Sequence, residues 1–377
     1  MPDTPKALYL HIPFCTHLCS YCDFPKVLLS SADPKAYLSE LEKEILSLKI
    51  PEDSLSTIYI GGGTPSALTI EELEDLLSFL HSHFPSVEEF SMEANPDSLT
   101  EDKISILGKY GVNRVSLGVQ SVNPKLLALL MRHHTKEEVK DAVWNLKKHG
   151  ITNINLDFIY GIPGMKKDDV LDDIDFALSL KPTHLSFYSL QIEDGTLFGV
   201  RHVKAEEDDT LADQYELINK KLEERSYHRY EVSNFALPGF ECKHNLTYWH
   251  DETYYAAGLG ASGYIGNRRY TNTRSLTHYL QGKHVNEEEI ITPLDHEFEF
   301  LMLNLRLCKG FSLSKYSSLF GFDFYKRYQK SLSSAGEDLV EKGGFIAIKP
   351  EKLYTMDGTL LTLLQDLPDK DERRPQD

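Results

Sequence analysis

Six short β-rich runs alternate with amphipathic helical stretches in the first half of the chain, and this alternation restricts the fold more than any other feature. We expect strands at residues 7–12, 57–63, 89–95, 114–119, 154–161 and 184–190. We expect helices between them at residues 34–48, 70–84, 101–111, 136–150 and 168–180. Strands in series with helices form a parallel sheet covered by helices, with right-handed crossovers. The pattern therefore predicts an α/β fold, a partial (β/α)6 TIM-like barrel, with an open doubly wound sheet as the alternative.

The pattern changes after residue 200. An amphipathic helix at 208–227 and a strand at 229–235 lead into a loop-rich stretch, 235–273, that is rich in aromatic residues and glycine. Helices at 295–307, 313–321 and 323–343 then precede two strand-like runs, 345–350 and 352–356, which predicts a winged-helix-like α+β appendage. We therefore expect a barrel domain at 1–200, a substrate-facing extension at 201–283, a winged-helix-like domain at 284–364 and a disordered tail at 365–377.

Charge and composition exclude several classes of protein. The 377 residues include 40 Lys and Arg against 58 Asp and Glu, a net charge of −18, and no basic face for nucleic acid is visible. No run approaches the ~20 apolar residues of a membrane span, and residues 1–12 lack the pattern of a secretory signal. Five cysteines, three of them crowded together, predict a reducing compartment rather than a disulfide framework. We expect a cytoplasmic protein without a nucleic-acid partner.

Cys15, Cys19 and Cys22 directly follow the first expected strand with the spacing C-x3-C-x2-C. Soft thiolates suit zinc or an iron–sulfur cluster. A structural zinc site takes four protein ligands, so His17 or a distant cysteine would have to complete it. A [4Fe–4S] cluster held by three cysteines instead leaves one iron open for a substrate or cofactor, and this is our interpretation of the motif.

Polar and glycine-rich elements also follow the other expected strands. The second strand ends in Gly61–Gly63, the next three end in or carry Glu93, Gln120 and Asp157, and Arg132 follows farther on. Taken singly, the glycines can form a tight turn, each polar group can be a buried hydrogen-bonded side chain, and the arginine can be a solvated helix end. Because the carboxyl ends of barrel strands meet on one face, these residues together predict one ligand pocket.

The cysteine motif resembles that of the radical S-adenosylmethionine (SAM) superfamily, in which the open iron binds SAM. The runs LYLHIPFC, YIGGGTPS, SMEANPDSLT, GVNRVSLGVQS, NLDFIYGIPG and YEVSNFA together resemble its anaerobic coproporphyrinogen III oxidase-like branch, over roughly residues 7–360. The resemblance implies a [4Fe–4S] cluster and SAM as cofactors, with Cys15, Cys19 and Cys22 as cluster ligands. It implies SAM contacts from Tyr9, Gly62, Gly63, Thr64, Glu93, Gln120, Arg132 and Asp157.

Two functions compete within that branch. The oxidases, which act in porphyrin biosynthesis, carry a further cysteine two residues after the third, where this chain has Phe24. They also carry a substantial N-terminal extension, whereas only eight residues precede Tyr9. Both departures resemble the HemW-type haem chaperones instead. The prediction is a chaperone that binds haem and transfers it to another protein, and an oxygen-independent coproporphyrinogen III oxidase is the alternative.

The segment 242–264 contains the pattern HNxxYW, which resembles the haem motif of HemW-type proteins. A neutral imidazole is a good axial ligand for haem iron, and aromatic rings offer flat faces to a porphyrin. Without the resemblance, core packing explains such a cluster. The resemblance implies haem contacts from His244, Asn245, Tyr248 and Trp249. Cys242 and His250 stay open as alternative axial ligands.

Three glycines follow this motif, at 258, 260 and 263, and they predict close backbone packing onto the mouth of the barrel. The expected partners are haem, an unidentified haem-accepting protein and an electron donor. Peripheral contact with membrane proteins, assembly as a homodimer and cleavage of SAM stay open.

Overall fold

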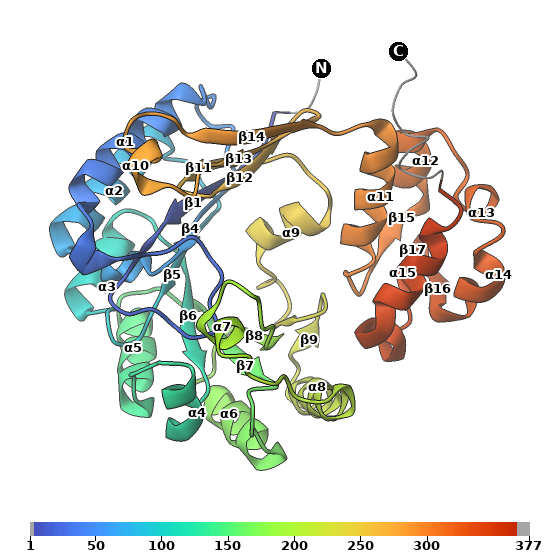
Figure 1. Cartoon of the computed structure of the whole chain (residues 1–377), viewed down its shortest axis with the longest axis horizontal. Coiled ribbons are helices and arrows are strands. Elements are labelled where there is room, and N and C mark those ends of the chain that lie inside the picture. Colours follow the sequence, from blue (N-terminus) through green and yellow to red (C-terminus); the bar gives the residue numbers. More distant parts are fainter. Residues whose placement is uncertain (1–3, 368–377) are drawn as a thin grey trace. The chain divides into compact units, whose positions relative to one another are not determined.

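The computed structural model describes residues 4–367, which form two compact units (Figure 1). The first unit contains the chain up to His228, together with Phe235–His244 and Thr253–Glu289. The second contains Arg229–Asn234, Asn245–Glu252 and the chain from Ile290 onward. Among the described residues, no helix is long and apolar enough to cross a membrane. The domain boundaries expected at 200, 283 and 364 separate segments with different expected functions, and they stay predictions.

Six parallel strands form the centre of the first unit, and Figure 1 shows them following one another through the sheet. They are β1 (Ala7–Ile12), β4 (Thr57–Gly62), β5 (Glu89–Ala94), β6 (Arg114–Gln120), β7 (Asn153–Tyr160) and β8 (His184–Ser189). Most of their residues are buried, as expected of strands covered by helices. The whole sheet runs in the order β11-β1-β4-β5-β6-β7-β8-β10-β9 and does not close. The predicted partial barrel is confirmed.

Five helices follow these strands on the outside of the sheet (Figure 1). They are α1 (Pro34–Ser47), α2 (Ile70–His83), α3 (Glu101–Lys109), α5 (Lys136–Lys148) and α6 (Lys167–Ser179). The Thr69 and Thr135 side chains begin α2 and α5 as capping boxes, in which a glutamate three residues later returns the hydrogen bond. The five predicted helices are confirmed to within one or two residues at their ends.

The stretch 235–273, which the sequence predicted to be loop-rich, is built largely of regular elements. They are β10 (Asn234–Ala236), α9 (Lys243–Trp249), β11 (Tyr255–Gly258), β12 (Ser262–Ile265) and β13 (Arg268–Asn272). β11 extends the barrel sheet by pairing in parallel with β1. β12, β13 and β14 (Val285–Ile290) form a separate three-stranded sheet. Most of these strands are short, and β11 and β12 each contain a glycine, so they give a weak alternating pattern in the sequence.

The glycines of this stretch pack closely, as predicted. A Cβ on Gly258, whose φ is +109°, would lie 2.5 Å from the carbonyl oxygen of His11. A Cβ on Gly260 would lie 2.4 Å from the Pro25 ring. Gly258 packs onto the carboxyl end of β1 and Gly260 onto the end of the cysteine loop, whereas Gly263 packs onto β13. No side chain fits at the first two positions, so the segment lies against the mouth of the barrel.

A buried carboxylate holds the added strands to the barrel. Glu44, on α1, accepts hydrogen bonds from the Gly258 amide at 2.9 Å, the Tyr279 hydroxyl at 2.5 Å and the Asn272 amide at 2.6 Å. Burial raises the pKa of this carboxyl group, and the three donors oppose that rise. One side chain thus ties together α1, β11, β13 and the short helix α10 (Leu276–Tyr279).

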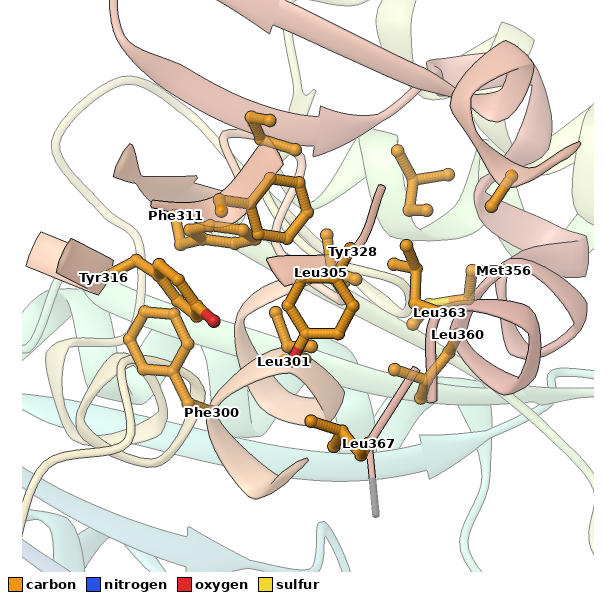
Figure 2. Close-up of a cluster of buried hydrophobic side chains, with 14 of the residues drawn as sticks. Phe300, Leu301, Leu305, Phe311, Tyr316, Tyr328, Met356, Leu360, Leu363 and Leu367 are labelled. Atoms are coloured by element: carbon orange, nitrogen blue, oxygen red, sulfur yellow. The ribbon is translucent and has the colours of Figure 1, made fainter. Parts of the chain in front are cut away.

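The second unit is built around its own hydrophobic core (Figure 2). Its main helices are α11 (Pro293–Asn304), α12 (Leu313–Phe320) and α15 (Met356–Leu364). Its small antiparallel sheet has the order β15-β17-β16, with β15 at Phe311–Ser312, β16 at Leu339–Lys342 and β17 at Phe345–Ile348. Helices followed by a hairpin agree with the predicted winged-helix-like appendage.

Two details of that prediction are wrong. The expected helix 323–343 is divided into α13 (Phe324–Arg327), α14 (Leu332–Ala335) and the strand β16, and the hairpin turns at 343–344. Both of those glycines have positive φ, +60° and +78°, as the tight turn between two antiparallel strands requires. The run 352–356, expected as a strand, lies in the 3-10 helix η4 (Pro350–Thr355) and the start of α15. Pro350 stands at the start of η4, where a missing N–H does no harm.

The expected disordered tail, 365–377, lies mostly outside the described residues. Of the three residues described, Leu367 is buried and Asp366 accepts a hydrogen bond from the Ser331 amide at 2.9 Å. The end of the described chain is therefore part of the second unit.

A buried glutamate joins the helices of the second unit. Glu297, 2% exposed, accepts hydrogen bonds from the hydroxyls of Tyr316 at 2.5 Å and Tyr328 at 2.8 Å. Arg327 donates to the same carboxylate through Nε at 3.2 Å and Nη2 at 3.0 Å. A buried carboxylate is tolerated only when it is paired and hydrogen-bonded in this way.

We expect Glu297→Ala to lower the free energy of unfolding by about 3 kcal/mol, because it leaves two buried hydroxyls and a guanidinium without their acceptor. Chemical denaturation of the full chain measures this change. The exposed Glu351→Ala is the matched control and should change stability by less than about 0.5 kcal/mol. Equal stability of the two variants would contradict the assigned role of Glu297.

Candidate active site at the carboxyl ends of the barrel strands

The cysteine loop follows β1 and is held by backbone hydrogen bonds. Cys15 lies in β2 (Phe14–Cys15), which pairs with β3 (Val27–Leu28) after the loop. At its tip, the Ser20 amide donates to the Leu130 carbonyl at 3.2 Å, and the Ser20 carbonyl accepts from the Phe198 amide at 3.0 Å. The loop is therefore fixed at its base and at its tip, although it contains almost no regular structure.

Cys15, Cys19 and Cys22 all line one cavity of about 510 Å³. A volume of this order is typical of small-molecule and cofactor sites. Seven of the eight predicted SAM contacts also line it: Gly62, Gly63, Thr64, Glu93, Gln120, Arg132 and Asp157. Tyr9 is not part of the lining; its hydroxyl lies 3.0 Å from Nδ1 of His11. The carboxyl ends of successive strands thus gather these side chains around one space, as the sequence predicted.

The surroundings of the thiols suit ligands of a cationic cluster. Burial raises the pKa of the Cys15 thiol to about 11, so a bound metal is needed to favour its thiolate. Two donors lie near the sulfur atoms, with Oγ1 of Thr64 3.7 Å from Sγ of Cys15 and Nη1 of Arg132 3.9 Å from Sγ of Cys19. Among the described residues, no three His, Cys, Asp or Glu side chains surround a point that a single metal ion could occupy. The three thiols line the same cavity, which suits a cluster in which each of three irons is bound by one thiolate.

The glycines at the end of β4 are required by the close approach of this strand end to β1 and to the start of the cysteine loop. Gly62 has a φ of +114°, and a Cβ there would lie 2.6 Å from the His11 ring. A Cβ on Gly63 would lie 2.7 Å from the Pro13 carbonyl group. The Gly63 amide donates to the Ile12 carbonyl at 2.8 Å. These glycines bring the end of β4 directly against the start of the cysteine loop.

Two partly buried carboxyl groups, those of Glu93 and Asp157, make the cavity acidic. Glu93 accepts hydrogen bonds from the Tyr59 hydroxyl at 2.9 Å and from the Gly62 amide at 3.0 Å. Burial, with Asp157 close by, raises the pKa of Glu93 to about 7. Asp157 accepts from the Ser116 hydroxyl at 2.6 Å, and burial raises its pKa as well. Two carboxyl groups destabilised in this way favour a cationic ligand between them.

Arg132 and Gln120 offer unsatisfied groups at the same cavity. Arg132 is 6% exposed and donates through Nη2 to Oδ1 of Asn95 at 2.8 Å and to the Gly118 carbonyl at 2.7 Å, so the alternative of a solvated helix end is wrong. Nε of Arg132 and Oε1 of Gln120 are buried without hydrogen-bond partners among the described residues. Gln120 also has a positive φ of +63°, a strained conformation typical of functional sites. A free donor and a free acceptor suit a zwitterionic ligand.

Several residues of the cavity were missed from the sequence, among them Asn95, Tyr21 and Tyr188. Asn95 bridges Arg132 and Thr64, donating to Oγ1 of Thr64 at 3.1 Å; its signal was its position two residues after Glu93. Tyr21 lines the cavity between the second and third cysteines, and burial raises the pKa of its phenol. Tyr188 lines it from β8, where alternation along the strand points it away from the buried Phe187.

The structure does not bring His244 to this cavity. The His244 ring is 1% exposed, and its Nδ1 lies 2.8 Å from Oγ1 of Thr57, the first residue of β4. Cys242 is fully buried, with Sγ 3.5 Å from Oε1 of Glu89, the first residue of β5. Both side chains therefore lie at the amino ends of the strands, whereas the cysteine loop follows a carboxyl end.

The remaining motif residues belong to the second unit. Asn245, Tyr248, Trp249 and the adjacent His250 are all partly exposed. The HNxxYW motif is thus divided after its first residue, with a buried histidine in one unit and partly exposed side chains in the other.

Comparison with known proteins places the chain in a family. Residues 9–177 match the Radical SAM superfamily. The chain is 42% identical to the heme chaperone HemW of Lactococcus lactis, over 88% of this chain and 90% of that protein. It is 38% identical to the heme chaperone HemW of Bacillus subtilis, over 90% and 92% of the two chains. This chain belongs to the HemW family.

The fold agrees with this assignment. The structure superposes on coproporphyrinogen III oxidase HemN from Escherichia coli with a TM-score of 0.84, covering 96% of this chain and 91% of that chain. The two sequences are 21% identical, so the likeness concerns the fold. This chain and HemN therefore share one architecture.

As a radical SAM protein, this HemW-family member carries a [4Fe–4S] cluster and SAM, and the predicted cofactors are confirmed. The cluster and SAM together supply one-electron and radical chemistry, which requires an electron donor. The three cysteines, with donors near their sulfur atoms and an acidic cavity beside them, fit these groups. The individual contacts to SAM and to the cluster stay predictions.

We expect Cys19→Ala to abolish the cluster, because a cubane with two protein ligands is not retained. Iron and sulfide content and the iron–sulfur absorption band, measured after anaerobic reconstitution, report the loss. Cys308→Ala, in the second unit, is the matched control and should leave both measurements unchanged. Full loading of Cys19→Ala would show that the ligand set is wrong.

Proposed function

We propose that this protein binds haem and delivers it to an acceptor protein in the cytoplasm, and that it does so with the [4Fe–4S] cluster and SAM in place. Its identity to proteins named heme chaperone HemW, 42% over 88% of the chain, is the observation that carries the proposal. The retained HNxxYW pattern supports it. Phe24, at the place where the oxidases carry a further cysteine, argues against the oxidase alternative.

Transfer of haem without turnover of a porphyrinogen is the direct test. The reconstituted protein is loaded with haem and mixed with an apo-globin as acceptor, and it is incubated separately with coproporphyrinogen III and SAM. We expect the globin to gain the haem spectrum and coproporphyrinogen III to be unchanged. Release of CO2 with formation of vinyl groups would identify an oxidase instead.

The partly exposed residues of the motif are the proposed haem contacts. Tyr248 and Trp249 offer aromatic faces, and Asn245 offers a polar edge. We propose His250 as the axial ligand, because burial lowers the pKa of its ring and keeps it neutral, as iron ligation requires. His244 has a pKa lowered to about 3 and is also neutral, but its ring is 1% exposed, so ligation by it would require the start of α9 to move.

We expect Trp249→Leu to weaken haem binding by roughly tenfold, because it removes an aromatic face from the proposed site. His250→Ala should in addition change the absorption spectrum of bound haem, since it removes the proposed ligand. Anaerobic titration with haem, followed by absorption, measures both. The chain has two tryptophans, and Trp144→Leu, at a position 62% exposed on α5, is the matched control that should bind haem normally. Equal haem affinity of all three variants would contradict the proposed site.

Glu93 is the proposed acceptor for the SAM ammonium group, which gives SAM binding a definite pH dependence. With a pKa raised to about 7, the side chain is largely protonated at pH 6 and ionised at pH 8. Because the ammonium favours the ionised form, we expect SAM affinity to rise by about tenfold per pH unit below pH 7, to level off just above it, and to fall above about pH 8, where the α-amino group of SAM itself loses its proton. Equilibrium binding of SAM to the reconstituted protein measures this. Glu93→Gln should bind SAM weakly, and its SAM affinity should not rise between pH 6 and pH 7. The same rise with pH in this variant as in the parent protein would contradict the role of Glu93.

A further inference from the structure

The buried histidine of the HNxxYW motif is held rigidly inside the first unit. Its backbone amide donates to Oε1 of Glu89 at 2.9 Å, and the amide of Lys243 donates to Oε2 at 3.0 Å. One carboxylate thus accepts the first two amides of α9, where the helix dipole favours negative charge. The His244 ring is fixed from its other side by Thr57, at 2.8 Å from Nδ1.

This histidine packs against a tyrosine of the barrel. The His244 and Tyr59 rings are stacked, with centroids 5.1 Å apart and an angle of 26° between their planes. Tyr59 also stacks with Tyr9, with centroids 6.3 Å apart at 27°. The rotation of a phenol ring about its last torsion is otherwise broad, so stacked neighbours decide the plane of the Tyr59 ring.

Tyr59 connects His244 to the cavity. It lines the cavity, and its hydroxyl donates to Oε1 of Glu93 at 2.9 Å. The other carboxylate oxygen of Glu93 accepts from the Gly62 amide at 3.0 Å. One continuous series of contacts therefore runs from the first residue of the HNxxYW motif, through one ring, to the carboxylate proposed to hold the SAM ammonium group.

We propose that His244 is a positioning residue of the SAM site, and that it acts by holding the Tyr59 ring so that its hydroxyl donates to Glu93. Nothing in this role requires His244 to bind iron. The motif then serves two cofactors, with its buried histidine acting at the SAM site and its partly exposed residues acting on haem. This inference rests on the proposed role of Glu93.

The effect of His244 is steric rather than electrostatic. Burial and the positive charge of Arg114 lower the pKa of the His244 ring to about 3, so the ring is neutral at physiological pH. The ionisable groups that act on Glu93 are Tyr9, Tyr59, Arg114 and Asp157. Tyr59 donates a hydrogen bond to the carboxylate and so favours its ionised form. If His244 no longer positions the Tyr59 ring, this hydrogen bond is weakened. The pKa of Glu93 then rises and the affinity for SAM falls.

Two substitutions separate stacking from hydrogen bonding. His244→Phe retains a flat ring against Tyr59 and loses the bond to Thr57, whereas His244→Gln retains a polar group and loses the ring. SAM affinity of the reconstituted protein is measured from pH 6 to pH 9, with the cluster absorption band as a check on folding. We expect His244→Gln to bind SAM roughly tenfold more weakly at pH 7 and to shift the midpoint of the pH profile upward by about one unit. We expect His244→Phe to match the parent protein.

Tyr59→Phe removes a single hydroxyl and should reproduce the His244→Gln profile, which keeps the comparison available even where a His244 variant folds poorly. The proposal is overturned if His244→Gln binds SAM as the parent does, or if His244→Phe loses as much affinity as His244→Gln. It is also overturned if both His244 variants lose haem affinity while SAM binding is unchanged, since His244 would then act as a haem ligand. Parent-like SAM binding by Glu93→Gln would show instead that the underlying role of Glu93 is wrong.

Discussion

The close approach of the end of β4 to the cysteine loop is the contact on which the rest of the site depends. A loop with three thiols and almost no regular structure needs a rigid surface beneath it, and the backbone of Gly62 and Gly63 provides one. With a Cβ at either position, the His11 ring or the Pro13 carbonyl would have to move. The Gly62 amide in the same segment donates a hydrogen bond to Glu93. The positions of the three cysteines and of the Glu93 carboxylate therefore depend on one short stretch of chain.

Placing polar and ionisable side chains inside the barrel costs free energy, because each of them would be better solvated in water. These side chains are Glu93, Asp157, Arg114 and His244. The structure offsets that cost with local partners, such as the Ser116 hydroxyl on Asp157 and the Thr57 hydroxyl beside His244. The offset is incomplete, since Glu93 keeps a pKa raised to about 7. A cationic ligand beside these carboxylates would complete the compensation, and this is the physical reason for the proposed role of Glu93 in binding SAM.

The parts of the fold with strong periodicity were predictable from the sequence, and the parts that depend on contacts between distant segments were not. The strands at 7–12 and 184–190 are short runs rich in apolar and aromatic residues, and the helix after Thr69 carries its own capping box, so both signals are local. β11 has the sequence YAAG, and it is a strand because the free edge of β1 is available to it. In the same way, the glycine pair 343–344 turns the chain into a hairpin where propensity favoured a helix. The cavity residues followed from the strand ends, whereas Asn95 and Tyr21 matter through their neighbours, which a sequence does not display.

The division of the HNxxYW motif has a thermodynamic consequence of its own. His244 belongs to the barrel unit, and the next five residues of the same short segment belong to the other unit. If SAM favours the conformation in which Tyr59 is held by His244, it also favours the conformation of α9 that places His244 there. A ligand bound to the partly exposed residues of the motif acts on the same helix. Coupling between two binding sites is reciprocal. If haem also favours that conformation of α9, haem and SAM each raise the affinity of the protein for the other by the same factor. Under the proposed function, α9, whose first two residues belong to the barrel unit and whose remaining residues belong to the second unit, would give a haem carrier a physical means to make haem binding depend on SAM.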